Sequence, residues 1–256
     1  RNGMPLLRRQ VHAVYALMDR LREAHPSVEI ESCASGGARI DYGILKRTHR
    51  VWLSDSNDAH ERWKMQNAAM QFLPPEIVGS HVGPRHCHTS GRELSMAFRA
   101  SVAMTGHMGF EMDLRELTPD EEATLARHTA LYKENRDWMH RGSQHRLQPP
   151  RPEIMAQMFV SEEKDRFLVF SATMAVPQSE TTGPLRLAGL EPTGKYRVRL
   201  LNFENLSRRA TRWFDSPLAG PGGLILSGGA LMRSGIVLPL AFPDTMWLVE
   251  GTREKR

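Results

Sequence analysis

Residues 28–62 contain two short strand-like runs, and each run leads into a loop and the start of a helix. The first run is 28–30, and a loop rich in small residues, 33–39, comes shortly after it. The second run is 51–53, and the polar segment 54–58 follows its carboxyl end. A repeat of strand, loop and helix is typical of an α/β barrel or a doubly wound sheet. In both architectures functional residues collect where the strands end, so both loops are favourable places for chemistry.

Four segments of the first half carry a resemblance to a known enzyme family. ESCASGGARIDYG (31–43) contains a Cys-x-x-Gly-x-x-Arg loop, and WLSDSNDAHERWKMQ (52–66) contains a Trp-x-Ser-Asp-x-x-Asp-Ala run. Both segments resemble the glycoside hydrolase family 36 α-galactosidases. Downstream, GSHVG (79–83) and MTGHMGFEMDLREL (104–117) are similar to the last two barrel strands of that family. The resemblance implies a sugar-cleaving barrel enzyme.

Composition sets wider limits on the fold and on the partners. A chain of 256 residues can form one large domain or two ordinary ones. No apolar run approaches the roughly 20 residues that span a bilayer, so we expect no membrane partner. The net charge is +5, but the arginines are spread along the chain without aromatic interleaving, so we expect no nucleic-acid partner. The two cysteines, Cys33 and Cys87, are too few for a disulfide framework and favour a reducing, cytoplasmic compartment.

Helices and strands are expected to alternate in the first part of the chain. We expect helices over 5–24, 41–47, 58–72, 91–104 and 118–139, and strands over 28–30, 51–53, 76–82 and 108–112. Thr118, followed by Pro119 and by Glu121, is a strong helix start. Residues 1–142 are therefore predicted to be the second half of a (β/α)₈ TIM barrel. A barrel does not begin at a helix that follows a missing strand, so we expect a fragment whose earlier strands lie upstream.

The pattern changes after residue 142. Pro149, Pro150 and Pro152 predict a linker over 143–152. Strands without intervening helices are then expected over 154–161, 166–174, 185–188, 195–202, 224–226, 230–233 and 245–250. This pattern predicts an antiparallel β-sandwich over 153–256, the carboxyl-terminal domain that the resemblance also implies. The predicted fold class is α/β plus all-β.

The resemblance gives Asp55 a catalytic role. Retaining glycosidases use two carboxylates about 5 Å apart, one nucleophilic and one serving as acid and then as base. The family's acid/base aspartate matches Asp55, and burial or a neighbouring carboxylate must raise the pKa of such an acid. The alternative is that Asp55 only caps a helix or turn. The family's nucleophile lies in a Lys-Trp-Asp motif that has no match here, so we expect the fragment alone to be inactive.

The resemblance also implies sugar contacts in the first loop. Cys33 would contact the sugar 2-hydroxyl through its side chain, and Gly36 through a backbone that glycine allows to approach closely. The alternative for this pair is a buried structural cysteine beside a flexible turn. Arg39 is a candidate to hold the loop by a charge-assisted hydrogen bond.

Three further residues are candidates for substrate binding. Trp52 is a candidate to stack on a pyranose, although an inward tryptophan is as often part of a core. Asp58 competes with Asp55 for the acid/base role, but its position as N-cap of the next helix, with Glu61 three residues on, accounts for it better. His81 follows the third strand, and a sugar contact and a packing role are equally compatible with its position.

The histidines and the cysteine of one loop suggest a different function, the binding of a metal ion. His81, His86, Cys87 and His88 are ligand types that suit zinc, but their spacing matches no finger pattern. We therefore expect no metal and no cofactor. The rival hypothesis is a non-catalytic carbohydrate- or metal-binding protein.

The resemblance therefore implies a retaining α-galactosidase that acts on terminal α-linked galactose of melibiose- or raffinose-type oligosaccharides. A transglycosylase or an α-N-acetylgalactosaminidase on the same scaffold is a close variant. Cys33 argues against the latter, because an N-acetyl group needs extra space beside O2. We expect a homo-oligomer in the full-length protein.

Overall fold

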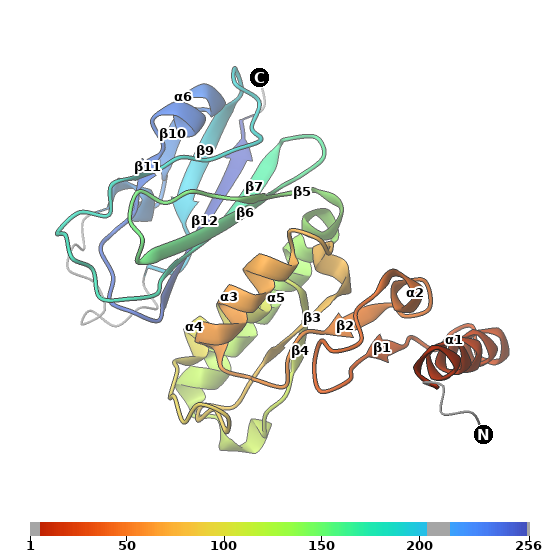
Figure 1. The fold of residues 1–256 in the computed structure, drawn as a ribbon. Helices are drawn as coiled ribbons and strands as arrows, with labels where there is room; N and C mark the ends of the chain where they lie inside the picture. Colours follow the sequence, from red (N-terminus) through yellow and green to blue (C-terminus); the bar gives the residue numbers. More distant parts are fainter. Residues whose placement is uncertain (1–5, 204–215, 255–256) are drawn as a thin grey trace.

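The computed structural model describes residues 6–203 and 216–254 and contains an α/β part followed by a β-rich part (Figure 1). The α/β part comprises α1 (Leu7–Ala24), β1 (Glu31–Ser32), α2 (Tyr42–Leu45), β2 (Arg50–Trp52), α3 (Ala59–Ala69), the 3₁₀ turn η1 (Pro75–Ile77), β3 (Val78–Val82), α4 (Met96–Ala103), β4 (His107–Phe110), the 3₁₀ turn η2 (Leu114–Glu116) and α5 (Pro119–Arg141). The β-rich part comprises β5 (Ser143–Arg146), β6 (Ile154–Val160), β7 (Arg166–Thr173), β8 (Pro184–Leu185), β9 (Lys195–Leu200), the 3₁₀ turn η4 (Pro217–Ala219), β10 (Leu224–Ser227), α6 (Gly228–Arg233), β11 (Ile236–Val237) and β12 (Thr245–Arg253).

The first four strands form one parallel sheet in the order β1-β2-β3-β4. This arrangement confirms the expected alternation of strands and helices. The strands are short, and β1 lies at 31–32, just after the run at 28–30 where a strand was expected. Because all four strands run the same way, the loops that follow β1, β2 and β3 meet at one edge of the sheet.

Side-chain caps begin α2, α3, α4 and α5, whereas α1 has none. Asp58 caps α3 as expected, although the Glu61 carboxylate accepts from Ser56 Oγ at 3.1 Å instead of completing a capping box. Thr118 and Glu121 form the predicted capping box of α5. Such caps satisfy backbone N–H groups that have no partner within the helix.

The later strands form a six-stranded antiparallel sheet in the order β10-β9-β12-β7-β6-β5, with a separate two-stranded sheet of β8 and β11. The expected antiparallel character is confirmed, but two local assignments are wrong. Residues 143–146, placed in a linker, form β5 and pair with β6. Residues 230–233, predicted as a strand, belong to α6, because Ser227 accepts from Ala230 N and caps a helix there.

Both faces of the antiparallel sheet are buried. One face packs against the segments that carry β8, β11 and α6, with Val169 and Trp247 contributed by the sheet. The other face packs against α3, α4 and α5, and alternate residues such as Phe170 and Leu248 point to it. The helices therefore lie between the two sheets, as Figure 1 shows.

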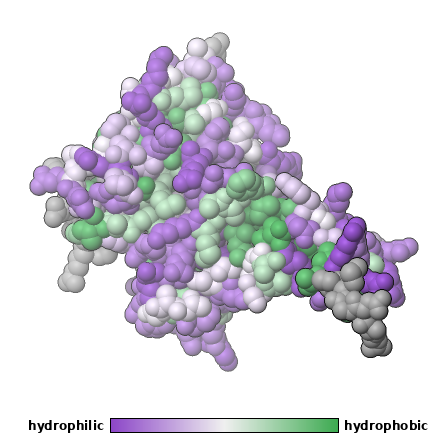
Figure 2. All heavy atoms as spheres, in the orientation of Figure 1, coloured by the Kyte–Doolittle hydropathy of each residue, from purple (hydrophilic) through white to green (hydrophobic). Residues whose placement is uncertain are grey.

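Apolar side chains remain at the surface of the described residues. Leu7 is 71% exposed and Leu17 is 54% exposed, and no residue of α1 is buried. Polar contacts such as Tyr15 Oη to Asp41 Oδ1 at 2.7 Å tie α1 to the turn that carries α2. Most of the face in Figure 2 is hydrophilic, with a hydrophobic area near its middle. None of the described helices is long and apolar enough to cross a membrane.

Candidate functional site

The loops after β1 and β2 bring two of the predicted residues together. Cys33 follows β1 and Asp55 follows β2, and Cys33 Sγ lies 3.8 Å from Asp55 Oδ1. Both side chains are exposed at the carboxyl edge of the parallel sheet, so the described residues do not give Asp55 the burial that was expected of an acid/base. A thiol and a carboxylate from different strands thus share one small region of surface, as the sequence predicts.

The backbone that carries Asp55 is held by its neighbours. Gly36 has φ +74°, and a Cβ atom on it would lie 2.5 Å from Ser54 Cα, so only glycine fits there without displacing the backbone of Ser54. Ser56 N donates to Ser54 Oγ at 3.2 Å. The close approach that Gly36 permits is therefore to the Asp55 loop. In the same loop the Arg39 carbonyl accepts from Ser32 Oγ at 3.0 Å.

Asp58 has a different environment from Asp55. Its side chain is fully buried, and Oδ1 accepts from the backbone N–H groups of His60 and Glu61 at 2.9 and 3.2 Å. Oδ2 accepts from Ser90 Oγ at 2.6 Å and from Arg92 Nη1. Burial raises the pKa of Asp58, but these hydrogen bonds and the Arg92 charge outweigh it and hold the pKa below its usual value. Asp58 caps α3 and anchors the loop between β3 and α4.

Trp52 and His81 stack on the face of the parallel sheet that α3–α5 do not cover. Their ring centroids lie 4.3 Å apart at an interplanar angle of 29°. Trp52 is only 6% exposed, so its ring is packed within the protein. The side chain of His81 is 26% exposed, and its Nδ1 lies 3.1 Å from Glu111 Oε2. His81 therefore reaches the solvent beside the Asp55 loop while Trp52 supports it.

Arg62 is the residue of this region that the sequence did not single out. It lies in α3, is 1% exposed, and its Cζ lies 4.0 Å from the Trp52 ring centroid. Burial lowers its pKa to about 10, against the opposing charges of Glu111 and Glu31. A charged residue in a helix is normally exposed, so neither charge nor helical spacing marked Arg62 as buried.

The cysteine–histidine loop has no metal-type cluster. Among residues 6–203 and 216–254, no group of three or more His, Cys, Asp or Glu side chains is arranged to hold a metal ion. Cys87 is buried, and its Sγ lies 3.1 Å from Thr89 Oγ1. Thr89 Oγ1 in turn lies 3.2 Å from Ser56 Oγ, so this loop packs against the Asp55 loop.

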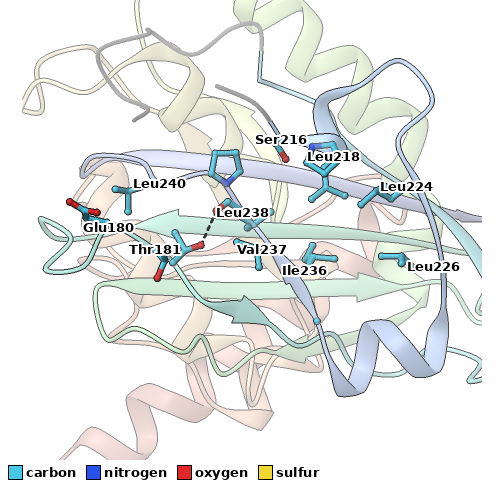
Figure 3. Close-up of a pocket in the computed structure, with 14 residues that line it drawn as sticks. Glu180, Thr181, Ser216, Leu218, Leu224, Leu226, Ile236, Val237, Leu238 and Leu240 are labelled. Atoms are coloured by element: carbon cyan, nitrogen blue, oxygen red, sulfur yellow. Dashed lines mark hydrogen bonds between the residues drawn. The ribbon is translucent and has the colours of Figure 1, made fainter. Parts of the chain in front are cut away.

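A cavity of about 500 Å³ lies in the β-rich part, away from this edge (Figure 3). Apolar side chains including Leu218, Leu226 and Ile236 line it. Thr182 Oγ1, also in the lining, donates to the Leu238 carbonyl at 2.8 Å. Among the described residues that line the cavity, Glu180 alone carries a carboxylate.

Sequence and structure comparisons relate this chain to known α-galactosidases. The chain is 39% identical to an α-galactosidase of Escherichia coli over 249 residues. This alignment covers 94% of this chain and 34% of that protein. It is 32% identical to the bifunctional α-galactosidase/sucrose kinase AgaSK of Mediterraneibacter gnavus, over 90% of this chain and 22% of that protein. A crystal structure of a variant of the α-galactosidase AgaA from Geobacillus stearothermophilus in complex with raffinose aligns with a TM-score of 0.83 at 27% identity, over 99% of this chain and 33% of that one.

The chain therefore spans about a third of the E. coli relative and of the AgaA structure. The sequence model of the Melibiase family matches residues 2–142. The model of the glycosyl hydrolase family 36 C-terminal domain matches residues 154–248. Two consecutive family models match, and the alignments to named α-galactosidases cover nearly all of this chain, so this chain belongs to glycoside hydrolase family 36.

Proposed function

We propose that the protein containing this chain is a retaining α-galactosidase that hydrolyses terminal α-linked galactose of melibiose- or raffinose-type oligosaccharides. Family membership supports the reaction class, and a relative solved in complex with raffinose supports the substrate class. We further propose that residues 1–142 are the second half of a (β/α)₈ barrel, with the nucleophile contributed by a strand outside this chain. A cytoplasmic location and a homo-oligomeric full-length protein stay predictions.

One observation carries the assignment of the acid/base. Asp55 presents an exposed carboxyl group 3.8 Å from Cys33 Sγ, at the edge where the loops of parallel strands meet. The other candidate, Asp58, is buried and already accepts four hydrogen bonds. A carboxyl group with no free lone pair cannot exchange protons with a substrate, so Asp55 is the better candidate.

In the proposed reaction Asp55 donates a proton to the glycosidic oxygen as the bond to galactose breaks. It then takes a proton from the water that hydrolyses the glycosyl-enzyme intermediate. Cys33 and the backbone of Gly36 contact the 2-hydroxyl, and His81 contacts the sugar from the next strand. Trp52 supports His81 from within the protein, and Asp58 serves the site by holding α3 and the β3–α4 loop.

The test is Asp55→Asn in the complete reading frame, because asparagine keeps the shape and removes the proton. We expect turnover of raffinose to fall by about 10²- to 10⁴-fold. Turnover of a dinitrophenyl α-galactoside should fall far less, because its leaving group departs without a proton. Asp165→Asn is the matched control, since Asp165 lies in the β6–β7 turn of the other part, and it should leave both rates unchanged.

Two results would contradict the proposal. Unchanged raffinose turnover in Asp55→Asn would remove Asp55 from the mechanism. An NMR time course in which the β-anomer of galactose appears first would show inversion in place of retention.

A further inference from the structure

We infer that Arg62 is the positioning residue of Asp55: its guanidinium fixes the peptide that carries Asp55 and joins it to the neighbouring strand. The inference rests on the proposed acid/base role of Asp55. It concerns a residue that does not touch the substrate.

The geometry runs directly from Arg62 to Asp55. Arg62 Nη1 donates to the carbonyl oxygen of Ser54 at 2.9 Å. That carbonyl belongs to the planar peptide unit whose N–H is the N–H of Asp55, so fixing the carbonyl fixes the orientation of the unit. One hydrogen bond and one planar peptide unit therefore connect the guanidinium to the Asp55 Cα atom, and no bond within that unit rotates freely.

The second arm of Arg62 reaches the next strand. Nη2 donates to the carbonyl oxygen of Gly79 at 2.8 Å, and Nε donates to Gln66 Oε1 at 3.2 Å. Ser54 follows β2 and Gly79 is the second residue of β3, so the planar fork joins the loop after one strand to the body of the next. The guanidinium also lies over Trp52, which stacks on His81. One buried side chain thus fixes the relative position of the proposed acid and the proposed sugar-contacting histidine.

Only arginine has the shape for this task. Its rigid fork directs donors at two carbonyl groups at once, whereas a lysine ammonium is a compact point on a flexible stem. Arg62 is 1% exposed, and no carboxylate among the described residues lies within ion-pair distance of it. A buried cation held mainly by carbonyl groups is costly to keep, and a packing role alone would be filled better by an apolar side chain.

Arg99 provides the matched control within the same part of the chain. It is 2% exposed and donates to the carbonyl oxygens of Leu94 and Gly83, at 3.0 and 2.7 Å, and to Glu121. Arg99 is therefore also a buried arginine that ties backbone segments together. It does not contact the peptide of Asp55.

The experiment compares Arg62→Lys, Arg99→Lys and Asp55→Asn in the complete reading frame, with aryl α-galactosides of graded leaving-group acidity. We expect Arg62→Lys to lower kcat by about 10- to 100-fold for poor leaving groups, because a displaced acid transfers its proton inefficiently. The loss should shrink to a few-fold for the dinitrophenyl substrate. Arg99→Lys should change all substrates by the same factor or not at all.

Each outcome decides the inference. A loss in Arg62→Lys that is equal across all leaving groups means a structural role only and overturns the inference, as does the same graded loss in Arg99→Lys. If Asp55→Asn shows no graded loss, the proposed function fails and the inference fails with it. If Arg62→Lys does not fold, Gln66→Met, which removes the acceptor of Arg62 Nε, must show the graded loss at about 3- to 10-fold. A uniform loss there overturns the inference as well.

Discussion

The six-stranded antiparallel sheet and the four-stranded parallel sheet differ in what covers their faces. The antiparallel sheet buries one face against the β8–β11 layer and the other against α3–α5, with apolar side chains on both. The parallel sheet packs one face against helices, and its other face carries polar groups and rings such as Glu31, Trp52 and His81. Burial of apolar area is the main stabilising contribution to a fold. The apolar contacts that stabilise the chain are therefore concentrated around one sheet, and the proposed chemistry lies at the other.

The first prediction tests where the stability lies. Phe170 is fully buried in β7 against the helices, and Phe110 is 47% exposed in β4. Phe170→Ala should lower the free energy of unfolding by about 3–5 kcal/mol, because it removes a buried ring and leaves a cavity. Phe110→Ala should change it by about 0.5 kcal/mol or less. Urea unfolding of the 256-residue chain measures both, and equal losses would contradict the contrast between the sheets.

The second prediction concerns the contact that joins the two parts. His60, in the first turn of α3, places Nδ1 2.6 Å from Oδ1 of Asp244, which comes just before β12. Asp244 has φ +60°, so asparagine, which tolerates this conformation, is the substitution that removes only the charge. A double-mutant cycle of His60→Gln and Asp244→Asn should give a coupling free energy of about 1–2 kcal/mol. A value near zero would mean that this contact does not stabilise the junction of the two parts, which also contains apolar packing and the hydrogen bond from Asn67 Nδ2 to Gln157 Oε1.

The third prediction is an acid sensitivity of the α/β part. Burial lowers the pKa of His128, whose Nδ1 lies 2.8 Å from the Thr124 carbonyl oxygen and whose Nε2 lies 3.1 Å from Ser101 Oγ. Below about pH 6.5 the unfolded chain binds a proton that the folded chain does not, so stability falls as the pH falls from about 7. Burial lowers the pKa of His107 and His140, also in the α/β part, in the same way. In the β-rich part burial lowers the pKa of His145, so the α/β part has more of these histidines.

The measurement is urea unfolding at pH 7.5 and at pH 5.5. The wild-type chain should lose more stability over this interval than His128→Gln does, by about 1 kcal/mol. An identical loss in both would show that His128 does not take part. Hydrogen exchange at pH 5.5 should show α4 and α5 opening before β7 and β12.

The elements that have strong local sequence signals were predicted correctly. Thr118, Pro119 and Glu121 specify a helix start without tertiary help, and α5 begins there. The run after β2 predicted the cap at Asp58, which the structure confirms. It also made Asp55 the acid/base candidate, and this role stays a prediction. Residues 230–233 were misassigned because Leu231 and Met232 suit a strand equally well. The start of α6 is also held by tertiary hydrogen bonds from Gly228 N and Gly229 N to the carbonyl groups of Gly194 and Pro192, which the local sequence does not reveal.

Other features depend on tertiary contacts and have no local signal. Buried residues of α3 include Arg62, Gln66 and Asn67, so helical periodicity could not indicate which face is covered. The prolines that follow β5 favoured a linker over 143–152, whereas β5 forms because it pairs with β6. The positioning role of Arg62 is visible only once the carbonyl groups of Ser54 and Gly79 are brought together in space.

The last strand of the chain occupies the middle of its sheet, between β7 and β9. Without β12 the sheet would divide into two separate groups of strands, β10-β9 and β7-β6-β5. The loss would leave two open strand edges, one on β7 and one on β9, and would remove Leu248, the residue that pairs with Phe170. A protein that lost this one strand would therefore expose unpaired edges and apolar side chains, the surface through which incompletely folded proteins aggregate.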